Sequence, residues 1–262
     1  MRSLRNGRLD FGAPVNDATP GGNGTSLRRR LDGYDCRLVA PLDETELQQL
    51  IAALTAPHHA DAISPRSGPL SGRAIVRRHD IPSVGPVVIK EFQRGGMLRV
   101  IRQRYYVRFG TTRPEREFDN LRSARSIGLN VPEPVACFSR GILLYRGWLA
   151  TRQISGRSLV EIATSDEQAI PALIADLARQ VGILIAHRVA HTDLHPGNVL
   201  VDPAGTVYLL DFDRAIALAE PLEDLRRRYA VRWTRAVEKH GLPAVLADRF
   251  REALDALSLG ER

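Results

Sequence analysis

Hydrophobic residues recur with two different periods along the chain, and the change between them falls close to residue 155. Before that point the apolar runs are short, rich in β-branched and aromatic residues, and bounded by glycine or proline, which is typical of β-strands. The run P-V-V-I-K-E-F at 86–92, with the preceding A-I-V-R-R-H, predicts a hairpin with Lys90 near the end of its second strand. Two further strands are predicted at 135–139 and 147–154.

Other stretches place apolar residues three and four positions apart, which predicts helices with one buried face. Residues 43–55 have this spacing with acids in the first turn, and residues 114–127 have it with a proline at the start. In the second half a long helix is predicted at 169–190, and two more, split by a Gly-Leu-Pro break, within 223–258. Between these helices, N-V-L-V-D and V-Y-L-L-D-F-D flank a Pro-Gly turn and predict two short strands.

This order of elements predicts an α+β protein with two lobes and a cleft between them. The N-lobe, residues 33–154, is strand-rich, and the C-lobe, residues 155–262, is short and helix-rich. Residues 1–32 contain many Gly, Pro, Asn and Thr residues and few apolar ones, with three consecutive arginines near their end. We therefore expect residues 1–32 to be a disordered tail.

Composition indicates which partners and which cellular compartment suit the protein. The net charge of +7 and the pI of about 10.0 suit an anionic partner. The two cysteines, Cys36 and Cys137, lie far apart, which predicts reduced thiols and a cytoplasmic location. We see no apolar run long enough for a transmembrane helix and no secretory signal. Only Lys90 and Lys239 of the 37 basic residues are lysine, which makes Lys90 a candidate for a site that requires a compact ammonium, although chance is the simpler explanation of this count alone.

Two polar motifs stand out in the second half, H-T-D-L-H-P-G-N at 191–198 and D-F-D at 211–213. His191 and His195 have the spacing of zinc ligands on a helix, but the following Pro-Gly favours a loop, and no H-E-x-x-H motif or nearby cysteine is present. A plainer alternative is that these polar residues only cap turns. We favour a third interpretation, phosphoryl transfer, because other parts of the chain match it.

In enzymes of the kinase type, H-x-D-x-x-x-x-N is followed by a strand pair and D-F-x. On this pattern Asp193 is the catalytic base that accepts the proton of the attacking hydroxyl. Asn198 and Asp211 supply the oxygen ligands that Mg²⁺ prefers and would hold the ion against the ATP phosphates.

The same scheme requires parts upstream, and they occur in the required order. Lys90 in V-V-I-K is placed to contact ATP, and Glu117 on the following helix is placed to pair with it, with Glu115 as the nearby competitor. A glycine turn should cover the phosphates. Gly72 is the candidate, with Gly68 as its alternative, although G-P-L-S-G lacks the full glycine-rich pattern.

With these motifs the chain resembles the lipopolysaccharide kinases, the family of 3-deoxy-D-manno-octulosonic acid (Kdo) kinase and the core heptose kinases. The resemblance covers roughly residues 70–235 and rests on V-I-K-E-F-Q-R-G-G-M-L, R-E-F-D-N-L, H-T-D-L-H-P-G-N-V-L-V and L-L-D-F-D-R-A. It implies a protein-kinase-like fold, ATP and Mg²⁺ as cofactors, and phosphorylation of a sugar hydroxyl on the lipid A-linked inner core, at the cytoplasmic face of the inner membrane. It implies the same roles for the residues already singled out: Lys90, Glu117, Asp193, Asn198 and Asp211.

The chain also departs from protein kinases. Asp213 replaces the glycine of D-F-G, and too few residues follow it for a large peptide-binding half, so protein phosphorylation is disfavoured. Two alternatives stay open. One is a small-molecule phosphotransferase of the aminoglycoside or choline kinase type. The other is a nucleotide-binding regulatory pseudokinase, which we would expect to lack Lys90, Asp193 or Asp211.

Two basic segments are candidates for binding. Residues 94–108 interleave arginines with Met, Leu, Ile and Tyr, which suits an anionic membrane surface or a phosphorylated glycolipid, although a solvated basic face is the alternative. Residues 226–233, R-R-R-Y-A-V-R-W, are interpreted as packing of the C-lobe with generic charge. No nucleic-acid-binding module is apparent, so no nucleic acid partner is expected.

Overall fold

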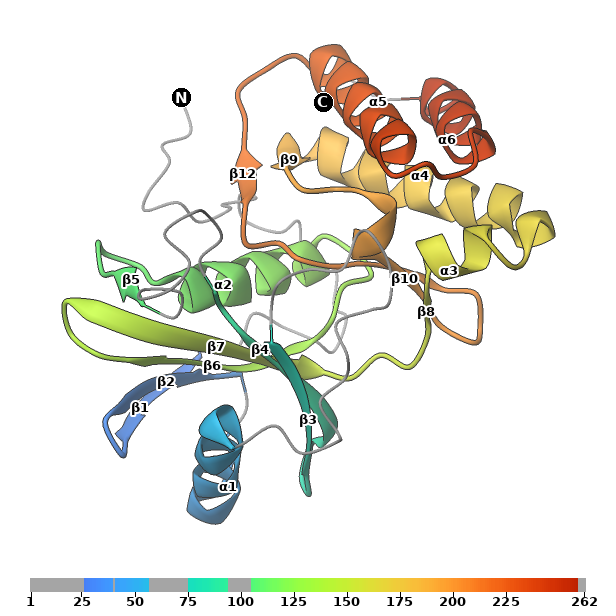
Figure 1. Ribbon diagram of the computed structural model, residues 1–262. Coiled ribbons are helices and arrows are strands. Elements are labelled where there is room, and N and C mark those ends of the chain that lie inside the picture. Colours follow the sequence, from blue (N-terminus) through green and yellow to red (C-terminus); the bar gives the residue numbers. More distant parts are fainter. Residues whose placement is uncertain (1–25, 40, 57–74, 94–104, 259–262) are drawn as a thin grey trace. The chain divides into compact units, whose positions relative to one another are not determined.

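The computed structural model describes residues 26–39, 41–56, 75–93 and 105–258 (Figure 1). The chain divides into two compact units, which we call the sheet unit (19–122 and 132–153) and the helical unit (1–18, 123–131 and 154–262). Strands dominate the first unit and helices the second, which confirms the α+β class and agrees with a kinase-like fold.

The sheet unit is built on one antiparallel sheet. Its strand order is β1-β2-β6-β7-β4-β3, with β5 paired to β7. The strands are β1 (Leu27–Leu31), β2 (Tyr34–Leu38), β3 (Ile75–Ile81), β4 (Gly85–Glu91), β5 (Tyr106–Val107), β6 (Pro134–Arg140) and β7 (Leu144–Arg152), and the helices are α1 (Glu44–Thr55) and α2 (Arg113–Ser126), which ends in the helical unit.

The alternation of side chains along each strand separates two faces of this sheet. In β2, Leu38 joins the hydrophobic core that includes α1, whereas the preceding Arg37 faces α2 and donates to both carboxylate oxygens of Asp119 at 2.9 and 2.8 Å. In β4, Ile89 joins the same core, so the next residue, Lys90, lies on the α2 face. Figure 1 shows α1 and α2 on opposite faces of the sheet.

The structure differs from the predicted disordered tail over its last residues. Leu27–Leu31 form β1, which makes an antiparallel hairpin with β2. The turn residues Asp32 and Gly33 have φ values of 51° and 77°, the left-handed conformation that Asp tolerates and Gly favours in two-residue hairpin turns. The arginines hid this strand from the sequence pattern because β1 is an exposed edge strand, where charged residues are common. Residues 1–25 lie outside the described part of the chain.

In the described part of the helical unit, short strands combine with four helices besides the end of α2. β8 (Arg157–Ser158) and β11 (Val207–Leu209) pair with either side of β10 (Val199–Val201), and β9 (Val189–His191) pairs with β12 (Ala215–Ala217). The helices are α3 (Leu159–Ala163), α4 (Ile170–Ala186), α5 (Leu222–Lys239) and α6 (Val245–Asp255). No helix in the described ranges is long and apolar enough to cross a membrane.

Helix α4 ends four residues before its predicted end. Arg188 has a φ of 56°, a left-handed conformation that ends the helical path, and the following V-A-H becomes strand β9. The interpretation of 226–233 as packing is confirmed, because Trp233 on α5 is fully buried. Its Nε1 donates to Leu246 O at 2.9 Å, and its ring lies 4.9 Å from that of Phe250.

The segment after α2, predicted to belong to the N-lobe, joins the helical unit. The buried Gln180 of α4 accepts from Asn130 N at 3.1 Å and donates to Val207 O at 2.7 Å. Asn130 O accepts from Leu209 N at 2.9 Å. These bonds fasten Asn130 to α4 and to β11, the strand that leads into the second polar motif.

Candidate active site

Lys90 and Glu117 form an ion pair inside the sheet unit. Lys90 Nζ lies 3.1 and 2.9 Å from the two carboxylate oxygens of Glu117. The Glu117 side chain is 4% exposed and that of Lys90 is 23% exposed. Lys90 Nζ also lies 5.0 Å from the ring centroid of Phe92, so both Glu117 and this ring hold the cation. The predicted pairing is present, and the contact of Lys90 with a nucleotide stays a prediction.

The competing acid, Glu115, has a different task at the start of α2. Its Oε2 accepts from the backbone N and the hydroxyl of Thr112 at 2.9 and 2.8 Å, as a residue near a helix N-terminus does when it caps the helix. Burial acts to raise the pKa of Glu115, but these hydrogen bonds and the charges of Arg37 and Arg28 hold it below its usual value. Residues two positions apart on a helix do not face the same side, so only Glu117 reaches Lys90.

In the helical unit, β9 ends at His191, and residues 192–198 form a loop to β10 with a single 3₁₀ turn rather than an α-helix. Asp193 is exposed at its centre. Asn198, at the end of the short 3₁₀ turn η2 (Pro196–Asn198), donates its Nδ2 to Asp193 O at 2.9 Å. His195 Nδ1 accepts from the backbone N–H two residues later at 3.1 Å. These bonds fix the loop from the Asp193 carbonyl to Asn198.

His191 links this loop to the residues just before and within the D-F-D motif. Its side chain is buried, and Nε2 lies 2.9 Å from Leu210 O. A carbonyl oxygen can only accept, so Nε2 carries the hydrogen of this bond, and burial lowers the pKa of His191, which favours the neutral ring. The ring also meets Phe212 edge-on, with centroids 4.7 Å apart.

Tyr229 on α5 holds the start of the loop by hydrogen bonds, and no pattern in the sequence predicted this role. Its hydroxyl accepts from His191 N at 2.8 Å and donates to Val189 O at 2.9 Å, in a fully buried position. One turn later Arg232 donates to Thr192 O. The only signal in the sequence is that a buried tyrosine needs a partner for its hydroxyl, and the identity of that partner depends on the tertiary structure.

The β10–β11 hairpin brings Asn198 and Asp211 to neighbouring positions. Leu210 N, directly before Asp211, donates to Asn198 O at 2.9 Å. Asp211 has a φ of 63°, a left-handed conformation that aspartate adopts more readily than most residues. Such backbone conformations cluster at functional sites.

The chemistry of these two residues fits Mg²⁺. A carboxylate and an amide oxygen are the hard ligands that this ion binds together with substrate phosphates. Because Nδ2 of Asn198 is used on Asp193 O, Oδ1 is the amide atom left for a cation. Asn198 and Asp211 as Mg²⁺ ligands stay a prediction, as does Asp193 as the catalytic base. Gly72, Gly68 and the arginines of 94–104 lie outside the described residues.

Comparisons with known proteins agree with the motifs. The model of the lipopolysaccharide kinase (Kdo/WaaP) family matches residues 71–235. A 3-deoxy-D-manno-octulosonic acid kinase of Vibrio vulnificus is 29% identical over 191 residues, which cover 68% of this chain and 78% of the relative. Proteins of the same name from Xylella fastidiosa and Xanthomonas axonopodis pv. citri are each 34% identical, over 186 residues (66% and 72%) and 223 residues (81% and 83%) respectively. The family match spans Lys90, Glu117 and both polar motifs, and the chain belongs to the lipopolysaccharide kinase (Kdo/WaaP) family.

Proposed function

We propose that this protein transfers the γ-phosphoryl group of ATP to a hydroxyl of Kdo in the lipid A-linked inner core of lipopolysaccharide. Membership of the family makes it a kinase with a sugar hydroxyl as acceptor. The choice of Kdo over heptose is supported by the three relatives, each named as a 3-deoxy-D-manno-octulosonic acid kinase. The same names disfavour a small-molecule acceptor of the aminoglycoside or choline type.

The observation that carries the proposal is the hydrogen-bonded loop that presents Asp193. We assign its exposed carboxylate the role of accepting the proton of the sugar hydroxyl. The hydroxyl oxygen forms a bond to the γ-phosphorus as the bond from that phosphorus to the bridging oxygen breaks, and ADP leaves. His191 and Tyr229 hold the loop before substrate arrives, so Asp193 needs little reorganisation.

The remaining residues bind phosphates and metal. Lys90, held by Glu117, offers an ammonium to the ATP phosphates. Asn198 and Asp211 would hold Mg²⁺, which supplies positive charge against the phosphate oxygens when bound.

A lipid A-linked acceptor also places the reaction at a membrane. We propose that the protein is peripheral on the cytoplasmic face of the inner membrane, where ATP and the glycolipid meet. The net charge of +7 supports attraction to anionic lipid. Of the basic segment 94–108, residues 105–108 belong to the described chain.

The proposal is tested by incubating purified protein with ATP, Mg²⁺ and one acceptor at a time, with product analysis by mass spectrometry. The acceptors are Kdo-lipid A, a heptosylated core lipid, an aminoglycoside and choline. We expect phosphate on the Kdo of Kdo-lipid A, lost in Asp193→Ala. Transfer only to the heptosylated lipid would indicate that heptose, and not Kdo, is the acceptor. Transfer only to the aminoglycoside or choline would refute a lipopolysaccharide acceptor.

A further inference from the structure

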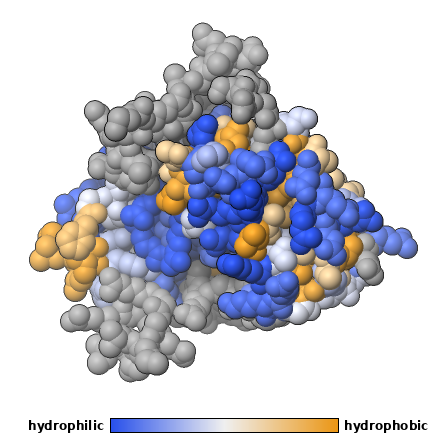
Figure 2. Space-filling model, turned by 90° about the horizontal axis from the view of Figure 1, so that it is seen from above, coloured by the Kyte–Doolittle hydropathy of each residue, from blue (hydrophilic) through white to orange (hydrophobic). Residues whose placement is uncertain are grey.

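The β6–β7 turn and the neighbouring β5 expose large apolar side chains to solvent. Ile142 is 79% exposed, Leu143 is 78% exposed and Phe109 is 86% exposed. They belong to one patch, because β5 pairs with the start of β7 through Val107 and Leu144. Figure 2 shows hydrophobic side chains gathered at the left, where this hairpin lies in Figure 1. We call the patch the hydrophobic tip; its residues are Tyr105, Val107, Phe109, Ile142, Leu143 and Leu144.

The backbone conformation of the β6–β7 turn is fixed by a glycine and a hydrogen bond, and it directs these side chains away from the sheet. Gly141 has a φ of 116°, and a Cβ there would lie 2.0 Å from Leu144 O, so the turn requires glycine. Arg108 N donates to Leu143 O at 2.9 Å, which fastens the segment after β5 to the turn. The apolar side chains therefore project from a fixed hairpin. Exposed apolar groups of this kind mark sites of interaction with a partner or a membrane.

Arginines frame the tip. A pocket that includes Gly141 and Ile142 of the turn is also lined by Arg30, Arg108 and Arg140. Arg108 donates to Gly141 O at 3.1 Å, so its guanidinium is held beside the turn. The Arg30 side chain is 71% exposed. Positive charge and apolar groups thus share one end of the sheet unit.

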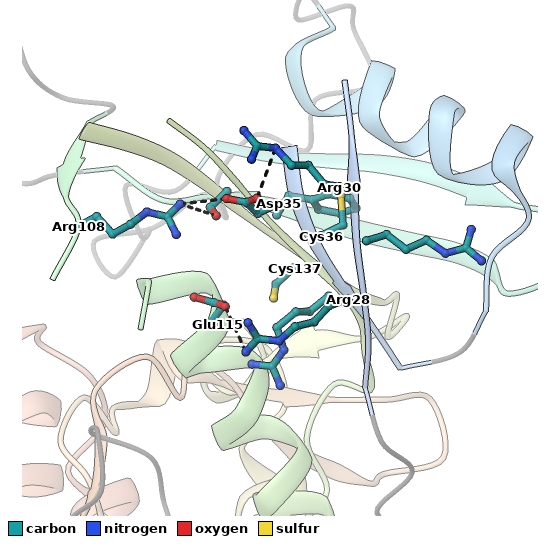
Figure 3. A pocket seen from close by; sticks show the side chains of 11 residues that line it. Arg28, Arg30, Asp35, Cys36, Arg108, Glu115 and Cys137 are labelled. Atoms are coloured by element: carbon teal, nitrogen blue, oxygen red, sulfur yellow. Dashed lines mark hydrogen bonds and ion pairs between the residues drawn. The ribbon is translucent and has the colours of Figure 1, made fainter. Parts of the chain in front are cut away.

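A second pocket continues this basic surface along β1 (Figure 3). It shares Arg30, Asp35 and Arg108 with the first pocket and extends to Arg28, which lies 4.0 Å from Glu115. In Figure 3, Arg30 and Arg108 both point toward Asp35, at 3.8 and 3.5 Å. Arginines outnumber carboxylates around both pockets, so the surface stays positive after these pairs form.

We infer that the hydrophobic tip inserts into the surface of an anionic bilayer while the framing arginines, Arg30, Arg108 and Arg140, bind lipid phosphate groups. Apolar side chains beside Lys or Arg are the combination that binds the interface of an anionic membrane. A second copy of this chain fits the patch less well, because its own arginines would face these arginines across the interface.

Strand β7 connects the tip to the residue proposed to bind ATP. Leu149 pairs with Lys90, and Leu144, five residues earlier on β7, lies at the tip. Five residues of strand span about 17 Å. Docking by the tip would therefore hold Lys90 close to the bilayer that carries the acceptor. The proposed role of membrane docking, to bring the active site to its lipid-linked acceptor, rests on the proposed function. The experiment below measures only binding to vesicles that contain no Kdo-lipid A, so its outcome is independent of phosphate transfer.

The inference is tested by sedimentation of the full chain with vesicles of phosphatidylglycerol and phosphatidylethanolamine, and with vesicles of phosphatidylcholine alone. We expect binding to the anionic vesicles only, weakened by salt, and weakened about tenfold by Leu143→Asp. The matched control is Val231→Asp, the same change at a 42% exposed apolar residue of α5, which should leave binding within about twofold. Arg140→Gln should weaken binding to the anionic vesicles and make that binding less sensitive to salt.

A second variant reports insertion directly. Leu143→Trp should show a blue-shifted tryptophan emission when anionic vesicles are added, against a constant background from the fully buried Trp148 and Trp233. Unchanged binding by Leu143→Asp together with an unshifted Leu143→Trp emission would overturn the inference. A dimer that Leu143→Asp dissociates, without change in vesicle binding, would assign the tip to a second copy instead. Either result leaves the test of phosphate transfer to Kdo-lipid A unaffected.

Discussion

Replacing Tyr229 by phenylalanine removes a single oxygen atom from the support of the catalytic loop. That hydroxyl accepts from His191 N at 2.8 Å and donates to Val189 O at 2.9 Å. The phenylalanine ring fills the same space, so no cavity forms and the change isolates the two hydrogen bonds. Burial raises the pKa of Tyr229 well above its usual value, so the hydroxyl keeps its proton throughout the pH range of an assay.

The expected cost follows from these two bonds. The variant leaves a buried N–H and a buried carbonyl without the hydroxyl, and an unsatisfied buried group costs about 1–3 kcal/mol. We therefore expect Tyr229→Phe to lower the free energy of unfolding by about 2–6 kcal/mol. Because His191 begins the loop that carries Asp193, kcat should also fall, by about tenfold or more. The KM for ATP should change little, since Lys90 is held separately by Glu117 in the sheet unit.

The assay is urea unfolding followed by tryptophan fluorescence, paired with steady-state phosphate transfer. The two tryptophans are fully buried, Trp233 on the same helix as Tyr229 and Trp148 in the sheet unit, so the emission detects unfolding of either unit. The control is Tyr105→Phe, which changes a 46% exposed tyrosine and should shift the unfolding free energy by less than about 0.5 kcal/mol. An equally small shift for Tyr229→Phe, with unchanged kcat, would refute the supporting role.

Three further predictions concern the two units. Glu117→Gln should raise the KM for ATP and lower kcat, whereas Glu115→Gln should lower the melting temperature and leave the KM unchanged; steady-state kinetics and thermal unfolding separate the two. Burial lowers the folded-state pKa values of His191 and His195, so the unfolded chain binds protons more readily than the folded protein. The contribution of these histidines to the free energy of unfolding is therefore present above about pH 6.5 and is lost as the pH falls below it, by up to about 1.4 kcal/mol per pH unit for the fully buried His191. Urea unfolding at pH 7.5 and 5.5 measures this loss. Gly156→Ala should cost about 1–3 kcal/mol in thermal unfolding, because a Cβ there would lie 2.2 Å from a backbone carbonyl oxygen of β10.

Local patterns were sufficient to predict most of the elements, whereas the pairing of Lys90 with Glu117 was predicted from the order of motifs in kinases. Strand alternation fixes the face of β4 on which Lys90 lies, and helical spacing fixes the side of α2 that presents Glu117. The loop form of 191–198 followed from one Pro-Gly step. In each case the deciding residues are neighbours in sequence.

Features that depend on distant residues were not predicted. Tyr229 meets His191 across 38 positions of sequence, and no local pattern links them. The edge strand β1 was missed because its arginines need no partner on the open side of the sheet. The apolar run G-I-L-L-Y has the composition of a core strand, yet Ile142 and Leu143 are exposed. They lie in a hairpin turn that extends past the hydrophobic core, and how far a turn extends depends on the tertiary structure rather than on the local sequence.

The most direct test of the central claim is single-turnover phosphate transfer from ATP to Kdo-lipid A by the native protein and by Asp193→Asn, with ATP binding measured alongside. Asparagine has nearly the shape of aspartate and cannot accept the proton. The account predicts that the rate falls about 10²–10⁴-fold while ATP affinity stays within about twofold. A variant that transfers phosphate at the native rate would contradict the assignment of this loop as the catalytic centre.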